Sequence, residues 1–145
     1  SRDNAEIELL STQTGANPSS YPADIGALAP SYLHLRRRHR RDDEIFLLAD
    51  VYIDERLSDK IDPTDFTSKT SMRLIADIPD LKIVDARQIL TIGSADPEVS
   101  ELLGVSLADP IAYVQRIAVA EDGTVALLAN GIYRGDMVRV EIKLT

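Results

Sequence analysis

Hydrophobic and charged residues alternate at the end of the chain, where four apolar residues are separated by Arg139, Glu141 and Lys143: Val138, Val140, Ile142 and Leu144. A period of two is the spacing of a β-strand with one face in water, so the pattern predicts a terminal strand over residues 138–144. Five further stretches have strand-like sequences: residues 32–41, 45–54, 82–93, 111–120 and 124–133. Asp122-Gly123 lies between the last two and predicts a hairpin turn, and Asp42-Asp43 holds the equivalent place between the first two.

Two segments have helical spacing instead. Asp96 before Pro97 is typical of a helix start, because the aspartate caps free N–H groups and proline suits the first helical position. Gly104 is placed to end this helix, whose inward stripe is Val99, Leu102 and Leu103. A second helix is expected near residues 70–78, with Met72, Ile75 and Ile78 inward.

The chain also contains an internal repeat. Residues 36–53 match residues 116–133 at an offset of 80, with five identities in 18 positions: Arg36, Asp42, Leu47, Leu48 and Ala49. Residues 22–29 match 97–104 in type at an offset of 75, which predicts a short helix there as well. The chain is therefore interpreted as two copies of strand, short helix and hairpin. We expect one α+β domain over residues 1–145, an antiparallel sheet with helices packed on one face.

Residues 36–43 read RRRHRRDD, a basic run in an acidic chain. Because this run forms the first strand of a predicted hairpin, its side chains alternate between two faces. One face receives Leu35, Arg37, His39 and Arg41, and the other receives Arg36, Arg38 and Arg40. At most half of these charges can face a common cavity.

Composition narrows the possible partners. The 145 residues carry a net charge of −8, and without the five arginines of the run 11 basic residues oppose 24 acidic ones, or −13. A chain with this negative charge outside the basic run repels phosphate backbones, which argues against DNA binding by this chain alone. No apolar run approaches the ~18 residues of a membrane span, and the lack of cysteine excludes disulfides and thiol chemistry. The opening Ser1-Arg2-Asp3-Asn4 has no initiator methionine, so a fragment of a longer protein is expected.

Catalytic, metal and cofactor signatures are missing from the sequence. His34 and His39 are five residues apart on one strand, so they lie on opposite faces and cannot share a metal. Asp59, Asp62 and Asp65 lack the spacing of a calcium loop and are interpreted as loop and cap residues. There is no glycine-rich phosphate loop and no nucleophile elbow. The cluster at residues 133–136, YRGD, leaves two interpretations open: an Arg–Asp pair that braces a turn, or a binding site.

The order and spacing of these segments resemble one known family. The chain is similar to the UTRA domain, the C-terminal effector-binding domain of bacterial GntR-type transcription regulators of the HutC subfamily. The resemblance is carried by residues 35–37 and 42–44, 51–53, 101–105, 116–123 and 133–136. It implies a fold like that of chorismate lyase, a small anionic effector, a homodimer and a cytoplasmic protein without membrane contact. It also implies that DNA is bound only through an N-terminal winged helix, which this chain lacks.

The resemblance further implies an effector site. Two strand positions that bind the anionic end of the effector in this family correspond to Arg37 and His39, and the family's closing tyrosine corresponds to Tyr133. Polar contacts from the central strand correspond to Ala86 and Gln88.

Two differences from the family reduce the range of effectors that this chain could bind. Glutamates that members binding sugar phosphates use correspond to Ala49 and Leu127. Acceptors for sugar hydroxyls are therefore missing, which argues against an amino-sugar phosphate.

Three functions remain to be separated. The first is a sensor that binds an anionic metabolite, has no catalytic residues and needs no cofactor or metal. The second is a chorismate lyase-like enzyme, which needs an acid in its pocket. The third is a dimerisation module without a ligand.

Overall fold

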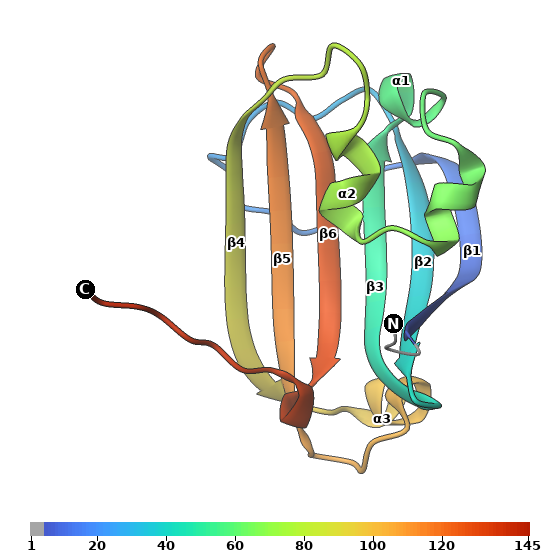
Figure 1. Ribbon diagram of the computed structural model, residues 1–145, viewed down its shortest axis with the longest axis vertical. Helices are drawn as coiled ribbons and strands as arrows, with labels where there is room; N and C mark the ends of the chain where they lie inside the picture. The colour runs from blue at the N-terminus through green and yellow to red at the C-terminus, as the bar shows by residue number, and fades with distance from the viewer. Residues whose placement is uncertain (1–4) are drawn as a thin grey trace.

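The computed structural model describes residues 5–145, so the Ser1–Asn4 opening lies outside the described residues. Its centre is a six-stranded sheet in which each neighbouring pair is antiparallel. The order across the sheet is β1-β2-β3-β6-β5-β4 (Figure 1). The strands are β1 (Ala5–Ala16), β2 (Tyr32–Arg41), β3 (Glu44–Asp54), β4 (Ile83–Ser94), β5 (Pro110–Ala120) and β6 (Val125–Arg134). The predicted antiparallel sheet is confirmed.

The strand order has the symmetry that the sequence repeat predicts. β1, β2 and β3 occupy one half of the sheet, and their equivalents β4, β5 and β6 occupy the other half in mirror order. β3 and β6 meet at the centre, where Asp50 is paired with Asn130. These two residues are related by the offset of 80, so a pseudo-two-fold axis passes close to them. The hairpin turns fall at the predicted positions, with positive φ at Asp42, Asp43 and Gly123.

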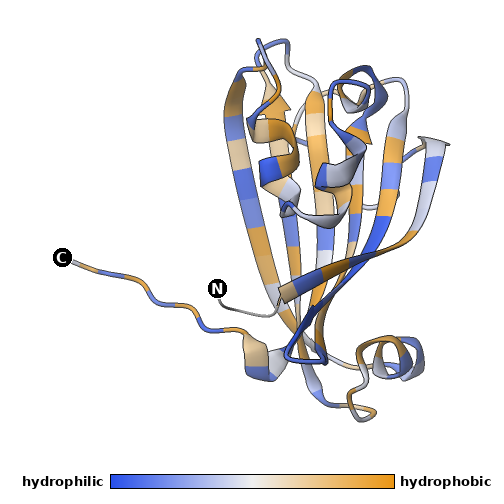
Figure 2. Ribbon diagram, turned by 45° about the vertical axis from the view of Figure 1, so that its right-hand side comes forward, coloured by the Kyte–Doolittle hydropathy of each residue, from blue (hydrophilic) through white to orange (hydrophobic). Residues whose placement is uncertain are grey.

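Three short helical segments cover one face of the sheet at one end (Figure 1). They are α1 (Glu55–Ser58), η1 (Pro63–Thr67) and α2 (Ser71–Ala76), and α2 lies within the predicted range. Leu74 and Ile75 of α2 pack on Val51 and Leu127 of the two central strands, which makes this the largest apolar cluster of the described residues. Figure 2 shows the alternation of hydrophobic and hydrophilic positions along the strands that this packing requires.

The remaining helix packs on the opposite face, which the prediction of helices on one face did not include. α3 (Pro97–Leu103) begins and ends as predicted: Asp96 accepts from the Val99 N–H at 2.8 Å, and Gly104 adopts a left-handed conformation. Its Val99 and Leu103 contact a cluster that contains Leu48 of β3. Leu48 alternates with Leu47, which faces the first layer of helices.

The helix predicted over residues 22–29 is absent, and this prediction was wrong. The segment instead crosses the β5–β6 hairpin, where the Ala27 N–H donates to the Gly123 carbonyl at 3.0 Å and the Ala27 carbonyl accepts from Val125 at 2.8 Å. Gly26 has a φ of +139°, which a helix does not allow, and a Cβ there would lie 2.8 Å from the Gly123 oxygen. Tertiary hydrogen bonds therefore override the local helical pattern.

The predicted terminal strand over residues 138–144 is also absent. After η2 (Gly135–Met137) the chain runs away from the sheet (Figure 1). Val140, Ile142 and Leu144 are 65%, 73% and 88% exposed. The alternation is present in the sequence, but a strand also needs a neighbour to receive its backbone hydrogen bonds.

The backbone conformation of the β2–β3 turn can be tested by substitution. Asp43 has a φ of +65°, a conformation that costs free energy for a residue with a Cβ. We expect Asp43→Gly to raise the free energy of unfolding by up to about 1 kcal/mol, because glycine removes this strain. Urea denaturation measures the change, and Gly123→Ala, at a φ of +85°, is the matched control that should lower stability. A loss of stability in Asp43→Gly would contradict the assigned turn.

Candidate functional site

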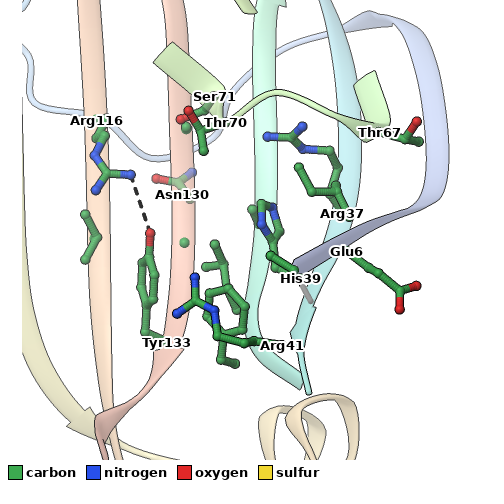
Figure 3. A pocket seen from close by; sticks show the side chains of 18 of the residues that line it. Glu6, Arg37, His39, Arg41, Thr67, Thr70, Ser71, Arg116, Asn130 and Tyr133 are labelled. Atoms are coloured by element: carbon green, nitrogen blue, oxygen red, sulfur yellow. Dashed lines mark hydrogen bonds between the residues drawn. The ribbon is translucent and has the colours of Figure 1, made fainter. Parts of the chain in front are cut away.

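A cavity of about 560 Å³ lies between the sheet and the connection from η1 to α2 (Figure 3). Its floor is formed by β2, β3, β6 and β5, its upper rim by residues 67–71, and one side by the start of β1. The basic side chains on its lining are Arg37, His39, Arg41 and Arg116. Hydroxyl groups come from Thr67, Ser68, Thr70, Ser71 and Tyr133.

Small residues at the centre of the sheet make room for the cavity. Ala49 of β3 pairs with Gly131 of β6, and Ala129 lies two residues from Gly131 on the same face. Further along these strands, Val51 and Leu127 carry larger side chains that fill the space beneath α2. A Cβ on Gly131 would lie 3.1 Å from Cε1 of Tyr133, so even alanine would crowd the tyrosine ring.

Strand alternation in the basic run is confirmed. Arg37, His39 and Arg41 line the cavity. The alternate arginines are engaged outside it: Arg38 and Arg40 lie 2.9 Å and 3.6 Å from Glu8, and Arg36 lies 3.8 Å from Asp50.

Arg37 is the most deeply buried of these cations, with 1% of its surface exposed. Its Nη1 donates to the backbone carbonyls of Phe66 at 3.0 Å and Lys69 at 2.6 Å, which ties β2 to the η1–α2 connection. Its buried Nε has no hydrogen-bond partner among the described residues. Burial lowers the pKa of Arg37 to about 10, so the guanidinium remains charged at neutral pH.

His39 lies two residues further along the same face and is 7% exposed. Its ring packs edge-on against Phe46 at a centroid distance of 6.0 Å, and its buried Nε2 has no partner within the described chain. Burial, together with the positive charge of Arg37, lowers the pKa of His39 to about 4. The imidazole is therefore neutral at pH 7 and can donate or accept a hydrogen bond.

Tyr133 and Arg116 stand on the other side of the cavity (Figure 3). The Arg116 Nη1 donates to the Tyr133 hydroxyl at 3.4 Å, and its Nε donates to Oε1 of Gln88 at 2.8 Å. The structure thus brings Arg37, His39 and Tyr133 to one cavity. Gln88 is exposed on β4 and is not a lining residue, so it reaches the cavity only through Arg116. Ala86 is also exposed and outside the lining.

Arg116 was not among the predicted site residues. The repeat at an offset of 80 aligns it with Arg36, whose side chain faces the opposite side of the sheet. The strand register corrects this alignment: Arg37 is paired with Ala49, and Arg116 is paired with Ala129. Since Ala49 and Ala129 are equivalent in the repeat, Arg116 corresponds to Arg37. The second hairpin is one residue longer, which hides the match.

Acidic residues contribute little to this lining. Glu6 is the acidic lining residue within the described chain, and its carboxylate points away from the basic groups in Figure 3.

Arg134 lies 2.8 Å from Asp136 and 3.1 Å from Glu44, which supports the turn-bracing interpretation of the YRGD cluster. Asp62 caps η1, as expected for a cap residue. Within residues 5–145 no group of histidine and acidic side chains could hold a metal ion.

Comparison with known proteins identifies relatives across nearly the whole chain. The family model of the UTRA domain matches residues 8–139. The HTH-type transcriptional regulator Rv0792c of Mycobacterium tuberculosis is 24% identical over 121 residues, which cover 81% of this chain and 44% of that protein. The chain therefore spans less than half the length of this curated relative.

Solved structures share the fold. A GntR family transcriptional regulator from Enterococcus faecalis has a TM-score of 0.76 and 22% identity, covering 94% of this chain and 99% of that one. The C-terminal domain of the histidine utilization repressor from Pseudomonas syringae has a TM-score of 0.76 and 14% identity, covering 98% and 99%. The effector domain of PhnF from Mycobacterium smegmatis has a TM-score of 0.76 and 15% identity, covering 99% and 88%.

None of the described helices has both the length and the hydrophobicity needed to cross a membrane.

The buried imidazole predicts a pH dependence of stability. The unfolded chain protonates His39 near pH 6.5, whereas the folded protein resists protonation until about pH 4. The unfolded state binds more protons between these values, so stability is full above about pH 6.5 and falls as the pH drops toward 4. The loss from this residue is on the order of 3 kcal/mol.

Urea denaturation of the wild type and His39→Gln at pH 7, 5.5 and 4.5, in buffers without phosphate or carboxylate, measures this dependence. Carboxylates titrate in both proteins, so the difference between the two slopes isolates His39. We expect the variant to lose less stability on acidification. Parallel curves would contradict the neutral, buried state of His39.

Proposed function

This chain belongs to the UTRA domain family, and we propose that it senses a small anionic metabolite for a GntR-type transcription regulator of the HutC subfamily. The family match and the likeness to the effector domain of PhnF support this proposal. The observation that carries the proposal for this chain is the buried guanidinium of Arg37, which lines a cavity and has no counter-charge among residues 5–145.

Burying a charge without a partner is costly, and proteins ordinarily pair such groups. This chain follows that rule elsewhere. Each arginine that the structure describes outside the cavity lies in an ion pair with a carboxylate: Arg36, Arg38, Arg40, Arg56, Arg73, Arg87, Arg134 and Arg139. Within the described chain Arg37 has neutral carbonyl partners only. An anionic effector would supply the missing charge.

The proposed roles follow from the geometry. Arg37 binds the anion through the donors that its two carbonyl contacts leave available, and His39 adds a hydrogen bond from its unpartnered Nε2. Tyr133 closes the cavity on the far side. Ala49 lines the cavity and Leu127 is buried in the apolar core, so neither supplies an acceptor for sugar hydroxyls. This supports an effector other than an amino-sugar phosphate.

The partners of this domain are part of the same proposal. A homodimer in the cytoplasm would present two DNA-binding domains to a two-fold operator. We assign DNA contact to a winged helix outside this chain, because the net charge of −8 opposes binding to phosphate backbones.

The two alternatives receive less support. An enzyme of the chorismate lyase type needs an acid in its pocket, and the two positions where the family resemblance would supply one are Ala49 and Leu127. Glu6 does line the cavity, but its carboxylate points away from the basic groups (Figure 3). A ligand-free dimerisation module does not account for a cavity of about 560 Å³ lined by a buried arginine that pairs with no carboxylate in the described part of the chain.

A thermal-shift screen over phosphosugars, dicarboxylates and aromatic acids tests the proposal and finds probes for calorimetry. We expect Arg37→Ala to weaken the binding of each probe that stabilises the wild type by about 10- to 100-fold, since a charge-assisted hydrogen bond contributes about 1.5–3 kcal/mol.

The matched control is Arg38→Ala, one residue away on the opposite face and paired with Glu8. It should change affinity little, and that change should shrink with added salt. Equal losses in the two variants, or a larger loss for Arg38→Ala, would place the effector elsewhere.

A further inference from the structure

We propose that the effector carries two anionic groups joined by an apolar spacer, and that Arg116 binds the second group as Arg37 binds the first. This inference rests on the proposed function, because it describes the ligand of the same cavity. It concerns the side of the cavity formed by β5 and β6, where the resemblance and the sequence pattern assign no charged contact.

The pseudo-two-fold symmetry of the sheet makes Arg37 and Arg116 equivalent. Arg37 on β2 is paired with Ala49 on β3, and Arg116 on β5 is paired with Ala129 on β6. The two alanines are related by the axis that passes near the Asp50–Asn130 pair. Both arginines line the cavity, and Figure 3 shows them on opposite sides of it.

The two arginines also share neutral hydrogen-bond partners, although Arg116 is only partly buried and Arg37 is fully buried. Arg116 donates to the amide oxygen of Gln88 and to the hydroxyl of Tyr133, which are neutral groups, as Arg37 donates to two backbone carbonyls. No ion pair of either guanidinium with a carboxylate occurs among the described residues. Neutral partners orient each side chain without compensating its charge. The cavity therefore offers two separate positions for a negative group.

The strand register gives the separation of these positions. Three spacings between neighbouring strands, each about 4.8 Å, separate β2 from β5. The residue of β5 that lies level with Arg37 across the sheet is Val114, and Arg116 is two residues further along that strand. The Cα atoms are therefore about 16 Å apart. Each guanidinium is held by its own partners, and the two lie on opposite sides of the cavity (Figure 3). We therefore assign a separate anionic group to each, at the two ends of one molecule.

The floor between the two arginines defines the middle of the ligand. It includes Ala49, Ala129, Gly131 and Val114, which present no side-chain acceptor or donor. Hydroxyl or amino groups that face this floor would lose their hydrogen bonds to water, whereas a hydrocarbon spacer can pack on it. The effector class is thus a dicarboxylate, or a carboxylate with a terminal phosphate or phosphonate, on an apolar chain.

Isothermal titration calorimetry of this chain with the unbranched diacids from malonate to suberate tests the inference. Each diacid is compared with the monoacid of equal carbon number, at fixed ionic strength, and ω-phosphonocarboxylates of the same lengths distinguish the two kinds of anion. We expect a maximum at an intermediate length, where the diacid binds about 10- to 100-fold more tightly than its monoacid.

Arg116→Gln should remove this preference by lowering diacid affinity far more than monoacid affinity, and Arg116→Lys should restore part of it. The control Arg87→Gln lies on the neighbouring strand, is paired with Asp24, and should retain the full preference. Melting temperatures of the ligand-free variants establish that each one is folded.

The outcomes separate the two proposals. If monoacids bind as tightly as diacids and Arg37→Gln still weakens their binding by about 10- to 100-fold, the anion site stands and the two-ended ligand is overturned. An equal loss of monoacid and diacid affinity in Arg116→Gln also overturns it. If no acid in either series binds, both proposals fail for carboxylates and phosphonates alike.

Discussion

A buried guanidinium that has no counter-charge among the described residues is the constraint on which the rest of this domain depends. Arg37 is held by two carbonyl groups of the η1–α2 connection, and its Nε remains without a partner inside the described protein. Removing a charge from water costs several kcal/mol unless other charges or hydrogen bonds compensate. The remaining free energy must come from the apolar packing of α2 on β3 and β6. Binding an anion would recover part of this free-energy cost, and the recovered free energy would contribute to the affinity for the anion.

The same contacts suggest how binding could be sensed. The hydrogen bonds of Arg37 join the floor of the cavity to its rim, because Phe66 and Lys69 belong to the segment that leads into α2. An anion that draws the guanidinium toward the cavity competes with these carbonyls for its donors. A ligand shifts a conformational equilibrium only through such a difference in interaction between two states. The η1–α2 connection is therefore the element whose position should depend on occupancy.

Local patterns predicted much of this architecture. The period of two placed Arg37 and His39 on one face, and the Asp-Asp and Asp-Gly pairs located both hairpin turns, because strand alternation and turn geometry depend on neighbouring residues. Asp96 and Gly104 likewise fixed the ends of α3 through contacts within one helical turn.

The errors arose where distant contacts decide the structure. Residues 22–29 follow the β5–β6 hairpin instead of forming a helix, and residues 138–144 lack a neighbouring strand. Arg116 was missed because one extra residue in the second hairpin changes which repeat positions share a face. Gln88 was placed in the site, whereas it contacts Arg116 from outside the lining. Register between strands, which the sequence alone did not reveal, determines both of these placements.

Titration of the two histidines by nuclear magnetic resonance tests most directly whether the buried charge is an anion site. His39 faces the cavity beside Arg37, and His34, hydrogen-bonded to Asp50 at 2.7 Å on the opposite face, provides an internal reference. The account predicts a His39 pKa near 4 in the free domain, and a clear rise when the tightest-binding acid probe saturates the cavity, because the anion favours the imidazolium. The signals of His34 should not respond to the probe. A His39 pKa near 6.5 in the free domain, or one that a bound anion leaves unchanged, would contradict the account.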